Sequence, residues 1–223
     1  MGMAKRRVFG ILCLAMFAVT AYFVVDAVAF PEPGKLTKLP AAAYFTIQSN
    51  ILVGVWFALI GLKELGVKTP RMDGAVNMML TVYISVTGLV YWAVLVPMLG
   101  ANPSMFSASN IWTHTVAPLY SLAIFFFILR GKSYGIGRAM LVVIYPLCYM
   151  AFSYLLLALT GHYTYPFLNP EKVGGWGVAV SIIGVAALVI SLALLYRRRW
   201  NRRSGEGIDA GIGRADAVDV NFS

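Results

Sequence analysis

The chain has little charge, little histidine and almost no cysteine, and each shortage excludes a class of protein. Asp, Glu, Lys and Arg make up only 12% of the sequence, whereas soluble domains are about a quarter charged. A domain of 223 residues also has too small an interior to bury a composition that is 60% hydrophobic. The composition therefore excludes a soluble enzyme and predicts a protein embedded in lipid.

The scarcity of metal-binding side chains excludes zinc and disulfide scaffolds. Cys13 and Cys148 stand alone within apolar runs, without a second cysteine at metal-binding spacing. Two histidines and scattered carboxylates do not form a zinc or di-iron ligand set, so we expect no metal and no cofactor. A haem carrier that uses His114 and His162 as axial ligands is an alternative, which an absorption spectrum would test.

What the sequence does have is a series of long apolar runs. A helix needs about 20 apolar residues to cross about 30 Å of hydrocarbon, and six runs meet that length. They extend from about 8 to 30, 41 to 62, 72 to 98, 110 to 129, 138 to 159 and 174 to 196. The sequence therefore predicts an all-α membrane protein: a basic N-terminus (1–7), a six-helix transmembrane domain (8–196), and a basic tail (197–223) that becomes disordered after about Ser204.

The basic residues that give the net charge of +9 are distributed in a pattern that indicates the membrane topology. Lys and Arg cluster before the first run and after the second, fourth and sixth, whereas the other connectors hold only Lys35, Lys38 and Lys172. The positive-inside rule then predicts that both termini are cytoplasmic. We expect a multi-pass protein of the plasma membrane, with membrane lipids and no nucleic acid as partners. The sequence carries no signal for an oligomeric state.

A signal peptide is the alternative interpretation of the first run. Lys5, Arg6 and Arg7 precede it, and residues 27–29 imitate a cleavage site. The run is longer than the about 7–15 residues of a signal core, and its removal would break the charge alternation. A first transmembrane helix is therefore the better interpretation.

Unusual polar residues gather at the predicted outer ends of the spans. An ionisable side chain within a span marks a functional site by default, and His114 is such a residue. Thr46 is predicted at a similar depth, so the two suggest a nucleophile and its base. Asn50 lies one helical turn from Thr46 and Asn110 one turn from His114. We expect Asn50 to stabilise an oxyanion and Asn110 to fix the imidazole tautomer, although either could equally join helices.

Three segments, 44–50, 110–118 and 160–168, together resemble the androgen-induced membrane hydrolase family, which includes the androgen-dependent TFPI-regulating protein and bacterial relatives. They occur in the family's order, within a resemblance that covers roughly residues 8–196. The resemblance implies a six-span intramembrane threonine hydrolase, whose animal members cleave fatty acid esters of hydroxy fatty acids. Thr46 and His114 match the family's nucleophile and base. Further candidates to support the site or bind substrate are Asn50, Asn110, Ser49, His162 and Tyr165.

The chain departs from the animal pattern at two positions. Animal members have a second histidine where this chain has Ile111, and an acidic residue where it has Ser49. Because the frame from Asn110 to Thr115 is retained, the departures bear on the substrate more than on the nucleophile and base. His162 has a second interpretation as an exposed loop residue, and Tyr165 as part of the outer mouth.

The resulting hypothesis is hydrolysis of a lipid ester through an acyl-threonine. One alternative is a non-catalytic lipid-binding or accessory protein, in which Thr46 and His114 only join helices. Another is a transporter, which requires polar residues along the whole path. The cytoplasmic halves of the spans offer little beyond Asp73, Asn77 and Thr81.

Overall fold

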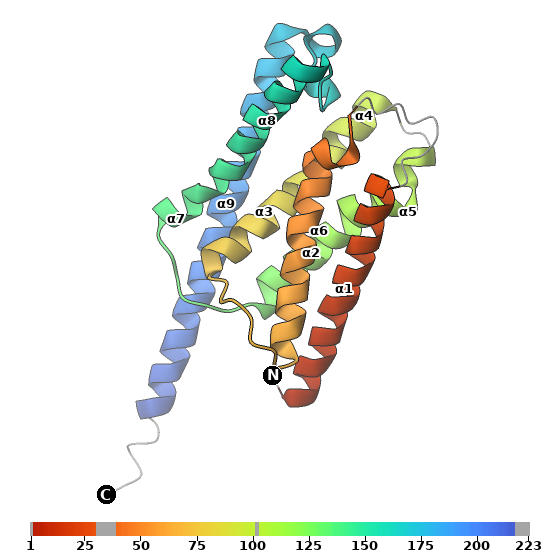
Figure 1. Ribbon diagram of the computed structural model, residues 1–223. Helices are drawn as coiled ribbons and strands as arrows, with labels where there is room; N and C mark the ends of the chain where they lie inside the picture. Colours follow the sequence, from red (N-terminus) through yellow and green to blue (C-terminus); the bar gives the residue numbers. More distant parts are fainter. Residues whose placement is uncertain (1, 30–38, 101–102, 217–223) are drawn as a thin grey trace, which may run out of the picture.

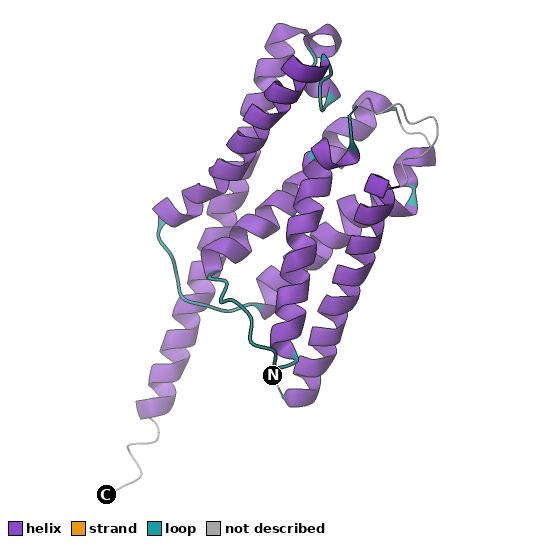
Figure 2. Cartoon of the chain, viewed as in Figure 1, coloured by secondary structure: helices purple, strands orange, loops and turns teal. Residues whose placement is uncertain are grey.

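The computed structural model describes residues 2–29, 39–100 and 103–216. This part of the chain is helical and contains no strand (Figure 2). Six of its helices are long and apolar enough to cross a membrane, which confirms the predicted six-span, all-helical fold. The predicted end of the first span at Phe30, the lysines Lys35 and Lys38, and residues 217–223 lie outside the described residues.

The spans run in the order of the predicted apolar segments (Figure 1). The first two are the single helices α1 (Met3–Ala29) and α2 (Phe45–Glu64), preceded in the second case by the 3₁₀ turn η1 (Ala41–Ala43). The third span joins α3 (Gly74–Val90), the π-helical turn η2 (Tyr91–Leu95) and α4 (Val96–Leu99). The fourth joins α5 (Ala108–Ile111), the π turn η4 (Trp112–Val116), α6 (Ala117–Ala123) and the π turn η5 (Ile124–Ile128), after the 3₁₀ turn η3 (Pro103–Phe106).

The last two spans form a long hairpin. The fifth joins α7 (Ile136–Met140), the 3₁₀ turn η6 (Leu141–Val143) and α8 (Ile144–Thr160), which ends at Gly161 with a φ of 72°. The 3₁₀ turn η7 (Pro166–Leu168) lies in the connection to α9 (Pro170–Asp216). In α9, Gly174 departs from helical geometry with a φ of 72°, so the first turn is offset from the rest.

The six crossings alternate in direction, so both ends of the described chain lie at one end of the bundle (Figure 1). The basic clusters around Lys5, Lys68, Lys132 and Arg198 belong to that end. Among the described residues, two ion pairs join elements there: Arg6 with Glu64 at 2.9 Å between Nε and Oε2, and Arg138 with Asp73. By the positive-inside rule we expect this end to face the cytoplasm.

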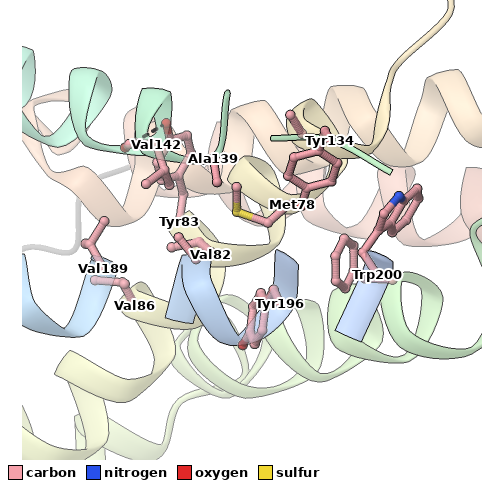
Figure 3. Packing of buried hydrophobic residues seen from close by; sticks show 13 residues of the cluster. Met78, Val82, Tyr83, Val86, Tyr134, Ala139, Val142, Val189, Tyr196 and Trp200 are labelled. Carbon is pink, nitrogen blue, oxygen red and sulfur yellow. Dashed lines mark hydrogen bonds between the residues drawn. The ribbon is translucent and has the colours of Figure 1, made fainter. Parts of the chain in front are cut away.

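Helix α3 is the centre of the bundle. The largest buried cluster joins α3 to α9 and to the start of the fifth span, and Figure 3 shows Met78, Val82 and Val86 of α3 facing Val189 and Tyr196 of α9. A second cluster joins α1 and α2 to the middle of α3. By contrast, α9 carries exposed apolar side chains such as Trp176, 88% exposed, on its outer face. Lipid is the expected solvent for that face.

The end of α9 is anchored to the loop that follows the fourth span. The buried guanidinium of Arg203 donates to the backbone carbonyls of residues 125–127, which lie in the last turn of η5. Trp200 donates from Nε1 to the Lys132 carbonyl at 3.1 Å. Since the last carbonyls of a helix lack partners within it, Arg203 satisfies groups that would otherwise be unpaired.

This anchoring accompanies a longer helix than the sequence predicts. We expected no regular structure after about Ser204, whereas α9 continues to Asp216. The Ser204 hydroxyl donates to the Gly131 carbonyl at 2.7 Å, which extends the anchored stretch by a further residue. Of the arginines in this stretch, Arg198, Arg199 and Arg202 are exposed, whereas Arg203 is buried in this internal contact.

Helices α1 and α2 approach closely at a pair of glycines. A Cβ placed on Gly61 would lie 2.8 Å from the backbone oxygen of Gly10, and one on Gly10 would lie 3.0 Å from the oxygen of Gly61. Small residues at helix contacts are how transmembrane helices reach van der Waals packing. Here the obstructing atoms include backbone oxygens, which cannot rotate away.

We therefore expect Gly61→Ala to lower the free energy of unfolding by about 1–3 kcal/mol through overpacking. The matched control is Gly184→Ala on the lipid-facing side of α9, where a Cβ would meet nothing within 4 Å. Thermal unfolding of both purified variants in one detergent measures the difference. Equal stabilities would contradict the close contact.

Candidate functional site

Thr46 lies in the first turn of α2, where backbone N–H groups have no partner within the helix. Its own N–H donates to the hydroxyl of Tyr165 at 3.4 Å. Tyr165 belongs to the connection between α8 and α9, 119 residues away in sequence. The contact therefore closes the loop of the last hairpin over the start of α2.

A pocket opens beside Thr46 between α3, α8 and α9. Its empty volume is about 680 Å³, including the open space at its mouth. Most of the lining is apolar, with Val86 and Val90 of α3 on one side and Val185 and Val189 of α9 on the other. The polar lining consists of hydroxyl groups, from Thr46, Thr87, Tyr149, Tyr165 and Ser181. The pocket thus suits a chain-like apolar ligand with a polar group near Thr46.

His114 is outside the lining of this pocket; it lies in the π turn η4 and is only 6% exposed. Its ring stacks on Tyr91 with centroids 3.7 Å apart and planes 7° apart. Its Nδ1 lies 3.4 Å from the Thr87 carbonyl oxygen. Because a carbonyl only accepts, this bond requires hydrogen on Nδ1 and leaves Nε2 of the neutral ring as the acceptor.

The third and fourth spans both change to π-helical geometry where these rings meet. Tyr91 begins η2, and His114 is in the middle of η4. Single π turns widen a helix locally and are frequent at functional sites. Gly88 permits the close approach, since a Cβ there would lie 2.8 Å from the His114 carbonyl oxygen.

Asn50 joins the two segments that carry Thr46 and His114. Its buried amide nitrogen donates to the Thr46 carbonyl at 2.8 Å and to the Thr113 carbonyl at 3.3 Å. Both amide hydrogens are therefore used, while the Oδ1 atom is buried without a partner. This arrangement gives Asn50 a helix-joining contact and leaves it no hydrogen for the oxyanion that we expected it to stabilise.

Ser49 and Thr87 continue the polar cluster. The Ser49 hydroxyl is 2.8 Å from that of Thr87, and it also reaches the Thr46 carbonyl at 3.1 Å. Thr87 therefore touches both sides of the site: its hydroxyl meets the α2 segment, and its carbonyl meets His114. Sequence reasoning missed Thr87, because a threonine within a long apolar run gives no signal of its partners.

Thr46 and His114 are not joined directly. Among the hydrogen bonds of residues 2–29, 39–100 and 103–216, none connects the Thr46 hydroxyl to the His114 ring. Ser49 bonds to the Thr46 carbonyl and to the Thr87 hydroxyl, and the Thr87 carbonyl bonds to His114. Two intervening residues, Ser49 and Thr87, therefore connect Thr46 with His114.

The remaining predicted residues have local contacts. Asn110 donates from Nδ2 to the Ser104 carbonyl at 2.8 Å, so the bond that orients the His114 ring comes from Thr87 instead. The backbone N–H of His162 donates to the Thr160 hydroxyl at 3.3 Å, and its side chain is half-buried in the loop. In the described part of the chain, no group of three or more His, Cys, Asp or Glu residues lies together as a metal site.

The three sequence segments singled out above meet in this site. Thr46 contacts Tyr165, which joins segments 44–50 and 160–168, and Asn50 contacts Thr113, which joins segments 44–50 and 110–118. Comparison with protein-family models, curated proteins and solved structures gave no match to the chain. The resemblance of the segments to a hydrolase family therefore rests on their residues alone.

Proposed function

We propose that this protein is an intramembrane hydrolase that cleaves a lipid ester with Thr46 as nucleophile and His114 as base. The observation that carries the proposal is the half-buried Thr46 at the polar edge of an apolar pocket within the bundle. An acyl chain matches the apolar lining, and its ester matches the hydroxyl-bearing edge. The resemblance to the androgen-induced membrane hydrolase family supports the same two residues in the same roles.

The proposed reaction is an acyl transfer in two steps. The Thr46 oxygen bonds to the ester carbonyl carbon, and its proton moves to Nε2 of His114. Because Thr46 and His114 share no direct bond, one water molecule carries this proton. The alcohol leaves with the proton from His114, and a second water then releases the fatty acid from the acyl-threonine.

The site lies at the end of the bundle opposite the basic clusters, because α2 begins there (Figure 1). With the basic end in the cytoplasm, the mouth of the pocket faces the outer leaflet of the plasma membrane. Membrane lipids are then both the solvent and the source of the ester. Water reaches the mouth from the outer surface.

One observation favours a second candidate, a non-catalytic lipid-binding or accessory protein. The His114 ring is stacked on Tyr91 and bonded to the Thr87 carbonyl, as a residue that only joins helices would be. On this alternative the pocket binds lipid without chemistry. The two candidates differ in whether Thr46 reacts.

Covalent labelling separates the hydrolase from the lipid-binding protein. In detergent, a fluorophosphonate probe should label the wild type at Thr46, and Thr46→Ser should retain labelling because serine keeps the hydroxyl. Thr46→Ala should lose labelling, and His114→Gln should slow it by about 10²-fold or more, the usual contribution of a general base. Mass spectrometry locates the adduct.

The matched control is Thr160→Ala at the end of α8, whose hydroxyl donates to the Leu156 carbonyl outside the pocket. It should label at the wild-type rate. A folded wild type that takes up no probe would overturn the hydrolase proposal in favour of the lipid-binding protein.

A second prediction tests the pocket as the acyl site. Val185 lines the pocket, so Val185→Trp should fill it and slow hydrolysis of a long-chain nitrophenyl ester by about tenfold or more. Hydrolysis of nitrophenyl acetate should change little, because acetate does not reach Val185. The control is Ile183→Trp, on the exposed face of the same helix. Equal losses for both esters would contradict an acyl site at Val185.

A further inference from the structure

The hydroxyl groups of the pocket differ in the acceptors of their hydrogen bonds. Three of them donate to backbone carbonyls within the protein: Thr87 to Tyr83 at 3.0 Å, Tyr149 to Ala43 at 3.1 Å, and Ser181 to Gly177 at 2.8 Å. Thr46 and Tyr165 remain, and neither donates to a carbonyl in the described residues. These two residues are neighbours, and their hydroxyl groups are the ones in the pocket that are not committed to a backbone carbonyl in the described residues.

Tyr165 is held in place by its ring and by the hydrogen bond that its oxygen accepts. Its oxygen accepts the Thr46 N–H at 3.4 Å, which occupies a lone pair. Its ring stacks on Phe167, with centroids 5.1 Å apart and planes 8° apart, and meets the edge of Tyr44 at 5.8 Å. A ring held in this way, with an O–H that donates to no carbonyl in the described residues, is the arrangement that a preorganised donor requires.

The hydroxyl also stays protonated at neutral pH. Burial raises the pKa of Tyr165, which outweighs the opposing effect of its contacts with Thr46 and Tyr149. Tyr165 is therefore a neutral donor under the conditions in which an esterase works.

An acyl transfer at Thr46 needs such a donor. When the Thr46 oxygen bonds to the ester carbon, negative charge moves onto the carbonyl oxygen and must be stabilised by hydrogen bonds. Asn50, the residue expected for this role, has donated both amide hydrogens to the Thr46 and Thr113 carbonyls.

We propose that the Tyr165 hydroxyl stabilises the oxyanion that forms when Thr46 attacks an ester. This inference rests on the proposed hydrolase function. Tyr165 donates a hydrogen bond to the carbonyl oxygen as charge develops, and its proton stays on the tyrosine. The charge returns to the carbonyl when the alcohol leaves, so no further reactant is needed.

The test is the steady-state kinetics of Tyr165→Phe with a nitrophenyl ester. Phenylalanine keeps the ring and its stacking but removes the donor. We expect kcat to fall by about 10²–10³-fold, as on loss of one oxyanion donor, with KM nearly unchanged. The matched control is Tyr145→Phe, which removes a hydroxyl that donates to Gln48 outside the pocket, and it should retain the wild-type kcat.

The outcomes separate this inference from the hydrolase proposal. A wild type that is labelled at Thr46, together with an unchanged kcat in Tyr165→Phe, would overturn the oxyanion role and leave the hydrolase intact. A rise in KM at constant kcat would also overturn it, because that result indicates binding alone. A wild type without labelling or turnover would overturn the hydrolase itself.

A second measurement applies if Tyr165→Phe does not fold. Difluorotyrosine in place of Tyr165 keeps the ring and hydroxyl but lowers the pKa of that hydroxyl. The donor is then lost by ionisation at a lower pH, so the alkaline limit of kcat should move to lower pH. An unmoved limit would contradict donation by Tyr165.

Discussion

A polar group inside a bilayer has no water to bond with, so it must find its partner within the protein. In this bundle most buried hydroxyls do so locally, by donating to the carbonyl four residues earlier, which is the usual arrangement for Ser and Thr in helices. The residues with this bond are Thr20, Thr81, Ser85, Thr87, Thr113, Ser121 and Ser181. Thr46, the proposed nucleophile, does not follow this pattern.

Thr46 lacks the bond to the carbonyl four residues earlier because it lies in the first turn of α2. The residue four positions earlier is Ala42, in the preceding 3₁₀ turn, and its carbonyl accepts from Gln48 instead. In the described residues the Thr46 hydroxyl makes no bond to a helical carbonyl, and its N–H donates to Tyr165. The start of the helix, more than the residue type, makes this threonine available.

The sequence was sufficient for the spans and insufficient for the contacts between them. Apolar length predicts all six crossings, because the bilayer sets the length of a helix independently of its neighbours. The polar residues at the ends of the spans include Thr46, His114 and Tyr165. Their partners could not be predicted, since Thr87 and Tyr91 sit within the third apolar run and acquire their roles only when α3 lies against η4.

Asn50 also shows that the sequence could not predict contacts between spans. Its spacing from Thr46 is compatible both with a free donor towards a substrate and with a bond to the carbonyl four residues earlier. Which one forms depends on the Thr113 carbonyl, which comes from another span. The end of α9 is a parallel case, because Arg203 looks like one more basic residue until residues 125–127 supply three carbonyls for it.

The position of the site reconciles two needs of ester hydrolysis in a membrane. In the proposed mechanism water carries the Thr46 proton to His114 and later attacks the acyl-threonine, so the site must be near an aqueous surface. The acyl chain needs the opposite environment. On this proposal the pocket meets both needs, because its lining includes Thr46 at the start of α2 while its apolar walls continue along α3 and α9 as far as Val189. A threonine at the middle of the bilayer would contact the acyl chain but would have no access to water.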